Sequence, residues 1–236
     1  MTRARGEQAP EATPERAASS RARRPSPGQR YGLLLLVLIA TYLLSAFTTG
    51  LVINLAQIVL FMGTLLLALR NSLVSRRATR LLVAAALAGT AIMVALALAR
   101  PSGIVIGVAE IWTGLILLAT VVMIVRRIVA STTVTLQSIY AALSAYMIIG
   151  LMFAAFYGAM SRLGAGAFFA SGSPEDTKTF QYFSFTTLTT LGYGDFTAAS
   201  NIGRAVAVME AMTGQIFLAT LVARLVSAFR PSGPRD

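Results

Sequence analysis

Apolar residues fill long stretches of this chain and are separated by short polar segments. A helix needs about 20 mostly apolar residues to cross the hydrocarbon core of a bilayer. Residues 31–69 are too many for one crossing, since a helix of that length measures on the order of 58 Å. We therefore expect two helices, 31–47 and 51–69, split at Thr48-Thr49-Gly50. Four further spans are expected at 81–99, 104–125, 136–160 and 202–229.

The pattern thus predicts an all-α transmembrane fold with six membrane helices. Residues 176–191 are also apolar, but the stretch is short and rich in Thr and aromatic residues. These properties fit a re-entrant half-helix between the fifth and sixth spans better than another crossing. Residues 1–30 are rich in Arg, Ala, Ser, Pro and Glu without apolar periodicity, so we expect a disordered tail.

The positive charge of the chain follows this topology. The 236 residues include 20 Lys and Arg against 9 Asp and Glu. In the six-span arrangement 16 of the 20 fall on the side of both termini, which the positive-inside rule assigns to the cytoplasm. No basic face with base-reading groups accompanies them, so we expect contacts with anionic lipid and not with nucleic acid. The four on the other side are Arg100, Arg162, Lys178 and Arg204.

The composition also narrows the chemistry. The chain has no Cys and no His, which excludes thiol catalysis, disulfides and Cys-ligated metals and removes the commonest general base. The sequence also shows no motif in which paired Asp or Glu side chains would converge on one catalytic site. We expect neither an enzyme nor a bound cofactor.

One motif does carry chemistry. Residues 190–195 read Thr-Leu-Gly-Tyr-Gly-Asp, which resembles the selectivity filter of the potassium-channel family, T-V/L/I-G-Y-G-D. Gly-Tyr-Gly-Asp alone also suits a surface turn, but here a span and a short apolar segment precede it and another span follows. The resemblance covers roughly residues 135–228. It implies a homotetrameric pore that conducts K⁺ across the plasma membrane.

Backbone chemistry explains the glycines of the motif. A dehydrated cation needs oxygen ligands, which rows of backbone carbonyls supply in such filters. To point successive carbonyls the same way, some residues must adopt left-handed φ and ψ, which Gly192 and Gly194 do at little cost. By resemblance, the ion sites consist of backbone carbonyls and one hydroxyl. The motif residues are Thr190, Leu191, Gly192, Tyr193 and Gly194, followed by Asp195.

The predicted spans and the resemblance together divide the chain into a tail (1–30), a four-helix membrane domain (31–130), a pore domain (131–230) and a short tail (231–236). Tyr182 and Phe183 stand where the family often has an aromatic pair. Tyr182 keeps a hydroxyl for Asp195, and simple aromatic packing is the alternative for both residues. Side chains expected to support the filter are Tyr182, Thr186, Thr189, Asp195 and Glu210.

Three residues of the predicted spans have open roles. Glu210 lies inside the last span, where an acid is a functional candidate; we expect it to hold the half-helix or filter by a hydrogen bond, with a pore-lining role as the alternative. Gly214 stands where the family has a gating hinge, but glycine also permits close helix packing. Glu110 is expected to pair within the first four spans or to lie beside Trp112 at the outer interface.

The fourth span, 104–125, contains no Lys or Arg. Steep voltage gating by this helix is therefore not expected, since it needs charges that move through the field. The alternatives to a potassium-selective channel are a weakly selective cation channel, a secondary transporter and a non-conducting membrane scaffold. A transporter often shows broken helices in two related halves, whereas this sequence predicts one such segment.

Overall fold

The computed structural model describes residues 29–47, 61–66, 76–131, 133–164, 166–173 and 175–228. These residues are helical apart from loops and one isolated bridge between Phe169 and Ala198. Residues 61–66 are also helical. The labelled helices are α2 (Gln29–Phe47), α4 (Arg76–Ala99), α5 (Gly103–Ala130), α6 (Leu136–Leu163), α7 (Thr177–Leu188) and α8 (Asn201–Ala228).

Four helices within the described residues are long and apolar enough to cross a membrane. They coincide with the last four predicted spans, which are confirmed as long apolar helices. The apolar stretch of α2, Tyr31–Leu43, is shorter, and the predicted break at 48–50 with most of 51–69 lies outside the described residues. The four spans are Arg80–Ala99, Gly103–Ala130, Leu136–Leu163 and Asn201–Ser227.

Capping residues set the starts of the helices around the candidate site. Ser102 caps α5 by accepting from the Val105 N–H at 3.3 Å. At the start of α6, Thr135 and Ser138 form a reciprocal capping box. Asp176 caps α7 by accepting from the Thr179 N–H at 2.9 Å. The half-helix predicted over 176–191 ends at Leu188, because Thr190 has φ 57° and does not continue a right-handed helix.

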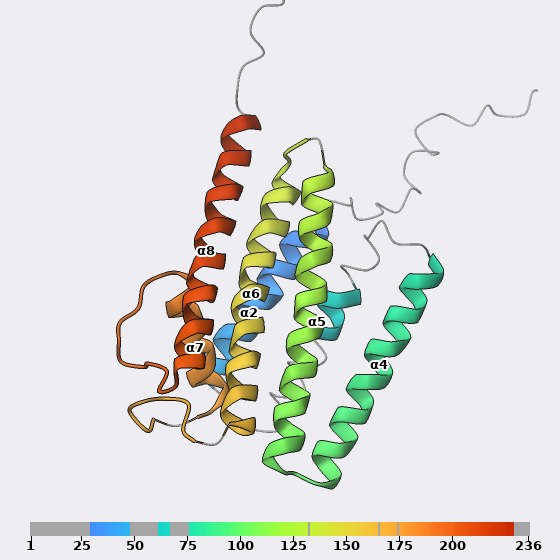
Figure 1. Cartoon of the computed structure of the whole chain (residues 1–236). Coiled ribbons are helices and arrows are strands. Elements are labelled where there is room, and N and C mark those ends of the chain that lie inside the picture. Colours follow the sequence, from blue (N-terminus) through green and yellow to red (C-terminus); the bar gives the residue numbers. More distant parts are fainter. Residues whose placement is uncertain are drawn as a thin grey trace, which may run out of the picture.

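The helices pack as a bundle in which α5 and α6 run antiparallel along most of their lengths (Figure 1). α4 lies against α5, and α2 lies against α6. The half-length helix α7 contacts both α6 and α8 near one end of the bundle (Figure 1). α7 and the loops beside it are thus held by the helix that precedes them and by the helix that follows them in the chain.

Helices α2, α5 and α6 share the main apolar core, with fully buried side chains such as Leu38, Leu117 and Ile148. Small residues allow close approach within the core. A Cβ placed on Gly114 would lie 2.5 Å from the Phe156 ring, so this glycine brings α5 against α6.

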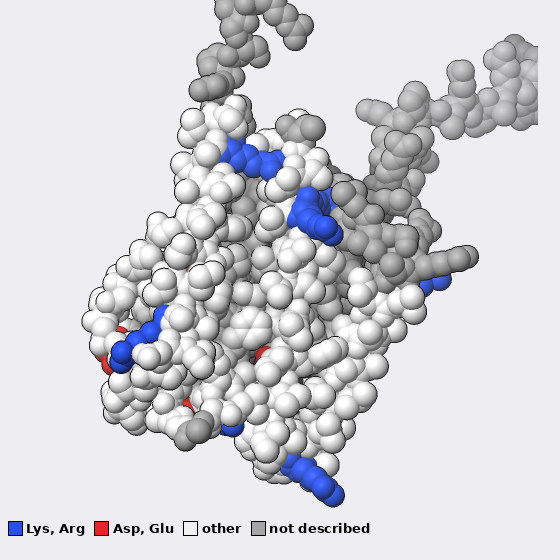
Figure 2. All heavy atoms as spheres, viewed as in Figure 1, with Lys and Arg blue, Asp and Glu red and all other residues white. Residues whose placement is uncertain are grey.

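The face shown in Figure 2 carries few charged side chains, and most of its Lys and Arg lie toward the two ends of the bundle. Arg126, Arg127 and Arg224 lie near the C-terminal ends of α5 and α8. Arg100 and Arg204 lie at the opposite helix ends. The arrangement fits helices that cross a bilayer, with charges at the two interfaces.

Candidate functional site: the 190–195 segment and its supports

The segment 190–195, called the filter segment below, begins where α7 unwinds. The Thr186 carbonyl oxygen accepts from two backbone N–H groups beyond the helix, those of Leu191 at 2.9 Å and Gly192 at 3.1 Å. The Thr190 N–H donates to the Thr187 carbonyl at 2.9 Å. The last turn of α7 therefore fixes the first residues of the filter segment through its own carbonyls.

Left-handed backbone alternates along the filter segment. Gly192 has φ 52° and Gly194 has φ 79°, as the motif predicts, and Thr190 has φ 57°. Positive φ at every second residue is the condition for turning successive carbonyls toward one side. The positive φ of Thr190 was not predicted from the sequence. A non-glycine residue with left-handed φ carries backbone strain on the order of 1–3 kcal/mol, so this conformation is unusual for Thr.

Gln215 of α8 supplies part of the support that Thr190 needs. Its side-chain Nε2 donates to the Thr190 hydroxyl oxygen at 3.2 Å. No role for Gln215 was expected from the sequence, because nothing in its spacing indicated that α8 reaches the first residue of the filter segment.

The filter segment is open on a single chain. Leu191 is 55% exposed and Tyr193 is 68% exposed. A Cβ placed on Gly192 or Gly194 would meet no atom within 4 Å. Large apolar side chains and an open backbone at this position leave room for neighbouring protein.

Asp195 closes the filter segment and binds back to α7. The Tyr182 hydroxyl donates to its Oδ2 at 2.8 Å, which confirms the hydrogen bond predicted from the sequence. This bond to Asp195 raises the pKa of the Tyr182 phenol above its ordinary value. Because the pKa of Tyr182 is higher in the folded protein, the neutral phenol contributes to folding stability. This contribution is fully present below the ordinary pKa of 10.0 and is lost as the pH rises through the raised pKa of the folded state.

Phe183 lies in an aromatic cluster with residues of α6 and of the loop before α7. Its ring centroid is 5.0 Å from Tyr157, 5.5 Å from Phe169 and 5.9 Å from Phe168. Phe169 also contacts Phe196, the residue after Asp195, at 5.3 Å. The packing alternative thus holds for Phe183, while Tyr182 makes the predicted polar contact.

The loop before α7 pairs with the loop after the filter segment. Ala170 N–H donates to the Thr197 carbonyl at 2.9 Å, and Ala199 N–H donates to the Phe168 carbonyl at 2.8 Å. These two bonds flank the bridge between Phe169 and Ala198. The sequence did not predict this pairing of the two loops. The adjacent Phe168 and Phe169 in an otherwise polar loop were the available sign that the loop packs against the protein.

Glu210 joins three helices inside the bundle. It is fully buried, and its Oε2 accepts from the Tyr157 hydroxyl of α6 at 2.6 Å. Its Oε1 lies 2.5 Å from the Ser184 hydroxyl of α7. The predicted hydrogen bond between Glu210 and the half-helix is therefore present, with partners that the sequence did not identify.

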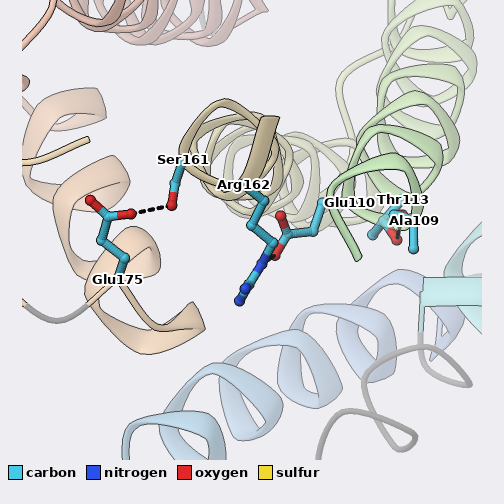
Figure 3. A network of polar contacts seen from close by, with 6 residues as sticks. All are labelled: Ala109, Glu110, Thr113, Ser161, Arg162 and Glu175. Atoms are coloured by element: carbon cyan, nitrogen blue, oxygen red, sulfur yellow. Dashed lines mark hydrogen bonds and ion pairs between the residues drawn. The ribbon is translucent and has the colours of Figure 1, made fainter. Parts of the chain in front are cut away.

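Glu110 makes a contact that the sequence did not predict. Its Oε1 lies 3.3 Å from Nε of Arg162, which belongs to α6 and not to the first four spans (Figure 3). The glycine at 158 permits this, because a Cβ there would lie 2.8 Å from the Glu110 carboxyl. Trp112 instead donates to Thr90 of α4 at 3.2 Å.

Glu175 ties the loop before α7 to α6. Figure 3 shows the Ser161 hydroxyl pointing at the Glu175 carboxylate, to which it donates. The other Glu175 oxygen accepts from the Phe168 N–H. The loop is thus anchored next to the aromatic cluster.

Gly214 lies where α8 meets the end of α7. A Cβ on Gly214 would lie 2.2 Å from the Leu188 carbonyl oxygen, so the glycine permits close packing. The same carbonyl accepts from the Tyr146 hydroxyl of α6 at 3.2 Å. The hinge role of Gly214 stays a prediction.

The remaining predicted supports act within α7. The Thr186 hydroxyl donates to the Phe183 carbonyl at 3.0 Å, and the Thr189 hydroxyl donates to the Phe185 carbonyl at 2.7 Å. Thr186 acts on the filter segment through its backbone. The described residues contain no cluster of three or more His, Cys, Asp or Glu side chains.

Comparison with known proteins gives one match. Residues 141–230 match a family model described as an ion channel. No curated protein and no solved structure matches the chain. The matched range begins in α6 and includes α7, the filter segment and α8. It supports an ion channel family for this membrane protein, with passive ion conduction and not enzymatic catalysis.

Proposed function

We propose that this protein is a potassium-selective channel that conducts K⁺ passively across the plasma membrane through a homotetrameric pore. The observation that carries the proposal is the Thr-Leu-Gly-Tyr-Gly-Asp string with positive φ at residues 190, 192 and 194. Carbonyl rings built from such segments replace the hydration shell of K⁺. The ion channel match over 141–230 supports the same class of function.

The ligands in this proposal are the carbonyl oxygens of residues 190–193 and the Thr190 hydroxyl oxygen. One segment supplies one oxygen at each level, so several chains are needed to surround an ion. Four copies around one axis fit the resemblance to potassium channels. The open surface around Leu191 and Tyr193 supports a neighbouring chain at that position.

The remaining parts of the proposal concern placement. Both termini lie in the cytoplasm, as the distribution of basic residues favours. Gly194 and Asp195 complete the filter, with Tyr182, Thr186, Thr189 and Glu210 as supports, and Gly214 is the candidate hinge of α8. The partners are other copies of the chain, membrane lipid and K⁺ as permeant ion; the channel needs no cofactor.

The test is current through purified protein in planar bilayers, with KCl on one side and NaCl on the other. A reversal potential near the potassium equilibrium value supports the proposal. A reversal potential near zero indicates a weakly selective cation channel. Saturable uptake without unitary current indicates a transporter, and absence of both indicates a scaffold.

A matched pair of glycine variants separates filter chemistry from general backbone strain. Gly192→Ala places a Cβ in open space at φ 52°, and Gly172→Ala does the same at φ 65° in the loop before α7. Both substitutions strain the backbone by about 1 kcal/mol or more. We expect Gly192→Ala to abolish selective conduction and Gly172→Ala to retain it. Unchanged selectivity in Gly192→Ala would overturn the filter assignment.

A further inference from the structure

We propose that α2, far from the matched channel range in sequence, positions α7 of the same chain and through it the filter segment. The inference rests on the proposed function, because it assigns α2 a role in that pore. Two contacts one helical turn apart carry it, and each joins the last turns of α2 to one face of α7.

The first contact is polar and buried. The Ser45 hydroxyl of α2 donates to Oε1 of Gln181 of α7 at 2.6 Å, with the Tyr42 carbonyl oxygen, at 2.7 Å, as its alternative acceptor. Ser45 is 5% exposed and Gln181 is 4% exposed. Without α2, the Gln181 amide would face an apolar environment, where an unsatisfied polar group is costly. A glutamine at this point of α7 therefore requires a polar partner from outside the half-helix.

The second contact is aromatic. The Tyr42 ring of α2 meets Phe185 of α7 edge-on, with centroids 4.7 Å apart and planes at 64°. On α6, a Cβ at Gly150 would lie 2.7 Å from the Phe185 ring. Phe185 is thus held by both α2 and α6. Because Gln181 and Phe185 are four residues apart, both contacts lie on the same face of α7.

The contacted turn of α7 leads directly into the filter segment. The Phe185 carbonyl accepts from the N–H and the hydroxyl of Thr189, at 3.1 and 2.7 Å. The next carbonyl, of Thr186, accepts from Leu191 and Gly192. A rotation or shift of α7 at Phe185 is therefore transmitted to the first residues of the filter segment.

The other end of α2 is anchored at the opposite end of the bundle. The Arg127 guanidinium of α5 lies 5.7 Å from the Tyr31 ring centroid. Between the two ends, Leu34 and Leu38 are buried in the core shared with α5 and α6. α2 thus extends from the C-terminal end of α5 to the half-helix α7 and contacts both (Figure 1).

Cross-linking tests the contact independently of conduction. The chain has no cysteine, so a Ser45→Cys, Gln181→Cys variant carries the two thiols alone. We expect a short bifunctional thiosulfonate to join them within one chain, seen as a linked peptide pair by mass spectrometry at monomer mobility on a denaturing gel. A Leu36→Cys, Gln181→Cys variant is the control, because Leu36 is 64% exposed on another face of α2. No cross-link, or one at dimer mobility, overturns the proposal.

Function is tested with substitutions in α2. We expect Tyr42→Leu to lower the K⁺ to Na⁺ permeability ratio or the open time of the channel several-fold, while the assembly stays intact. Tyr42→Phe keeps the ring on Phe185 and should behave as wild type, and Leu36→Ala should do the same. Wild-type conduction by Tyr42→Leu together with Ser45→Ala would overturn the positioning role. If the wild-type protein carries no potassium current, the proposed function is refuted. The cross-link between positions 45 and 181 then still reports whether α2 contacts α7 within one chain.

Discussion

At the scale of single residues, the hydrogen-bond donors and acceptors around Glu210 indicate the protonation state of its carboxyl group. The Ser184 hydroxyl has one hydrogen, yet its oxygen lies 2.5 Å from Glu210 Oε1 and 2.7 Å from the Gly150 carbonyl oxygen. If that hydrogen goes to the carbonyl, the contact with Glu210 needs a hydrogen from the carboxyl group. A carboxylic acid at Glu210 satisfies every contact, with Oε2 accepting from Tyr157.

A glutamine at position 210 tests this arrangement. Glu210→Gln supplies one donor for Ser184 and one acceptor for Tyr157, so we expect conduction and thermal stability close to wild type. Glu210→Leu leaves the two hydroxyls without that partner and should destabilise the protein by about 1–3 kcal/mol. Thermal unfolding in detergent and bilayer current measure the two effects. Equal loss in both variants would show that Glu210 acts through a negative charge.

At the scale of helices, the contact between α7 and α8 depends on the missing side chain of Gly214. The Leu188 carbonyl that faces Gly214 belongs to the backbone, so it cannot move aside as a flexible side chain could. The end of α7 and the filter segment therefore sit where α8 allows them to sit. A glycine in this position has a packing role whether or not α8 also bends there.

Packing and hinge roles at Gly214 predict different behaviour of a double variant. Gly214→Ala should force α7 and α8 apart and destabilise the protein by about 1–3 kcal/mol through overpacking, with loss of selective current. Adding Met212→Gly restores flexibility to α8 but not the clearance at Leu188. We expect no rescue of thermal stability or current by Met212→Gly. Full rescue would establish the hinge role instead.

The helices of the C-terminal half were predictable because their apolar stretches are long and bounded by caps and charges. The positive φ at Gly192 and Gly194 followed from a motif with a known backbone requirement, whereas the left-handed Thr190 that ends α7 early did not. The partners of Glu210 and Glu110 were not predictable, since Tyr157 and Arg162 come from another helix whose rotation no local pattern fixes. The bond between Ser45 and Gln181 spans 136 positions and depends on tertiary packing alone.

At the scale of the whole molecule, a single chain leaves the candidate site incomplete. α8 is mostly exposed along its apolar length, and the filter segment beside it carries exposed Leu191 and Tyr193. Lipid suits the outer faces of such helices, but a row of backbone carbonyls in an apolar environment needs partners. In the channel proposed here, neighbouring copies and the permeant ion together would meet that need.

The assembly should therefore depend on the ion it conducts. We expect native mass spectrometry to show four times the 25.0 kDa chain. K⁺ bound between chains should raise the dissociation temperature relative to Na⁺ at equal ionic strength, because a ligand of the assembled state stabilises it, by about 2.7 kcal/mol per site at a hundredfold excess over its dissociation constant. Gly192→Ala should keep the tetramer and lose the difference between the two ions, which separates ion binding in the filter from a general salt effect. A stable monomer or dimer, or equal dissociation temperatures in K⁺ and Na⁺ for the wild type, would contradict a shared potassium site.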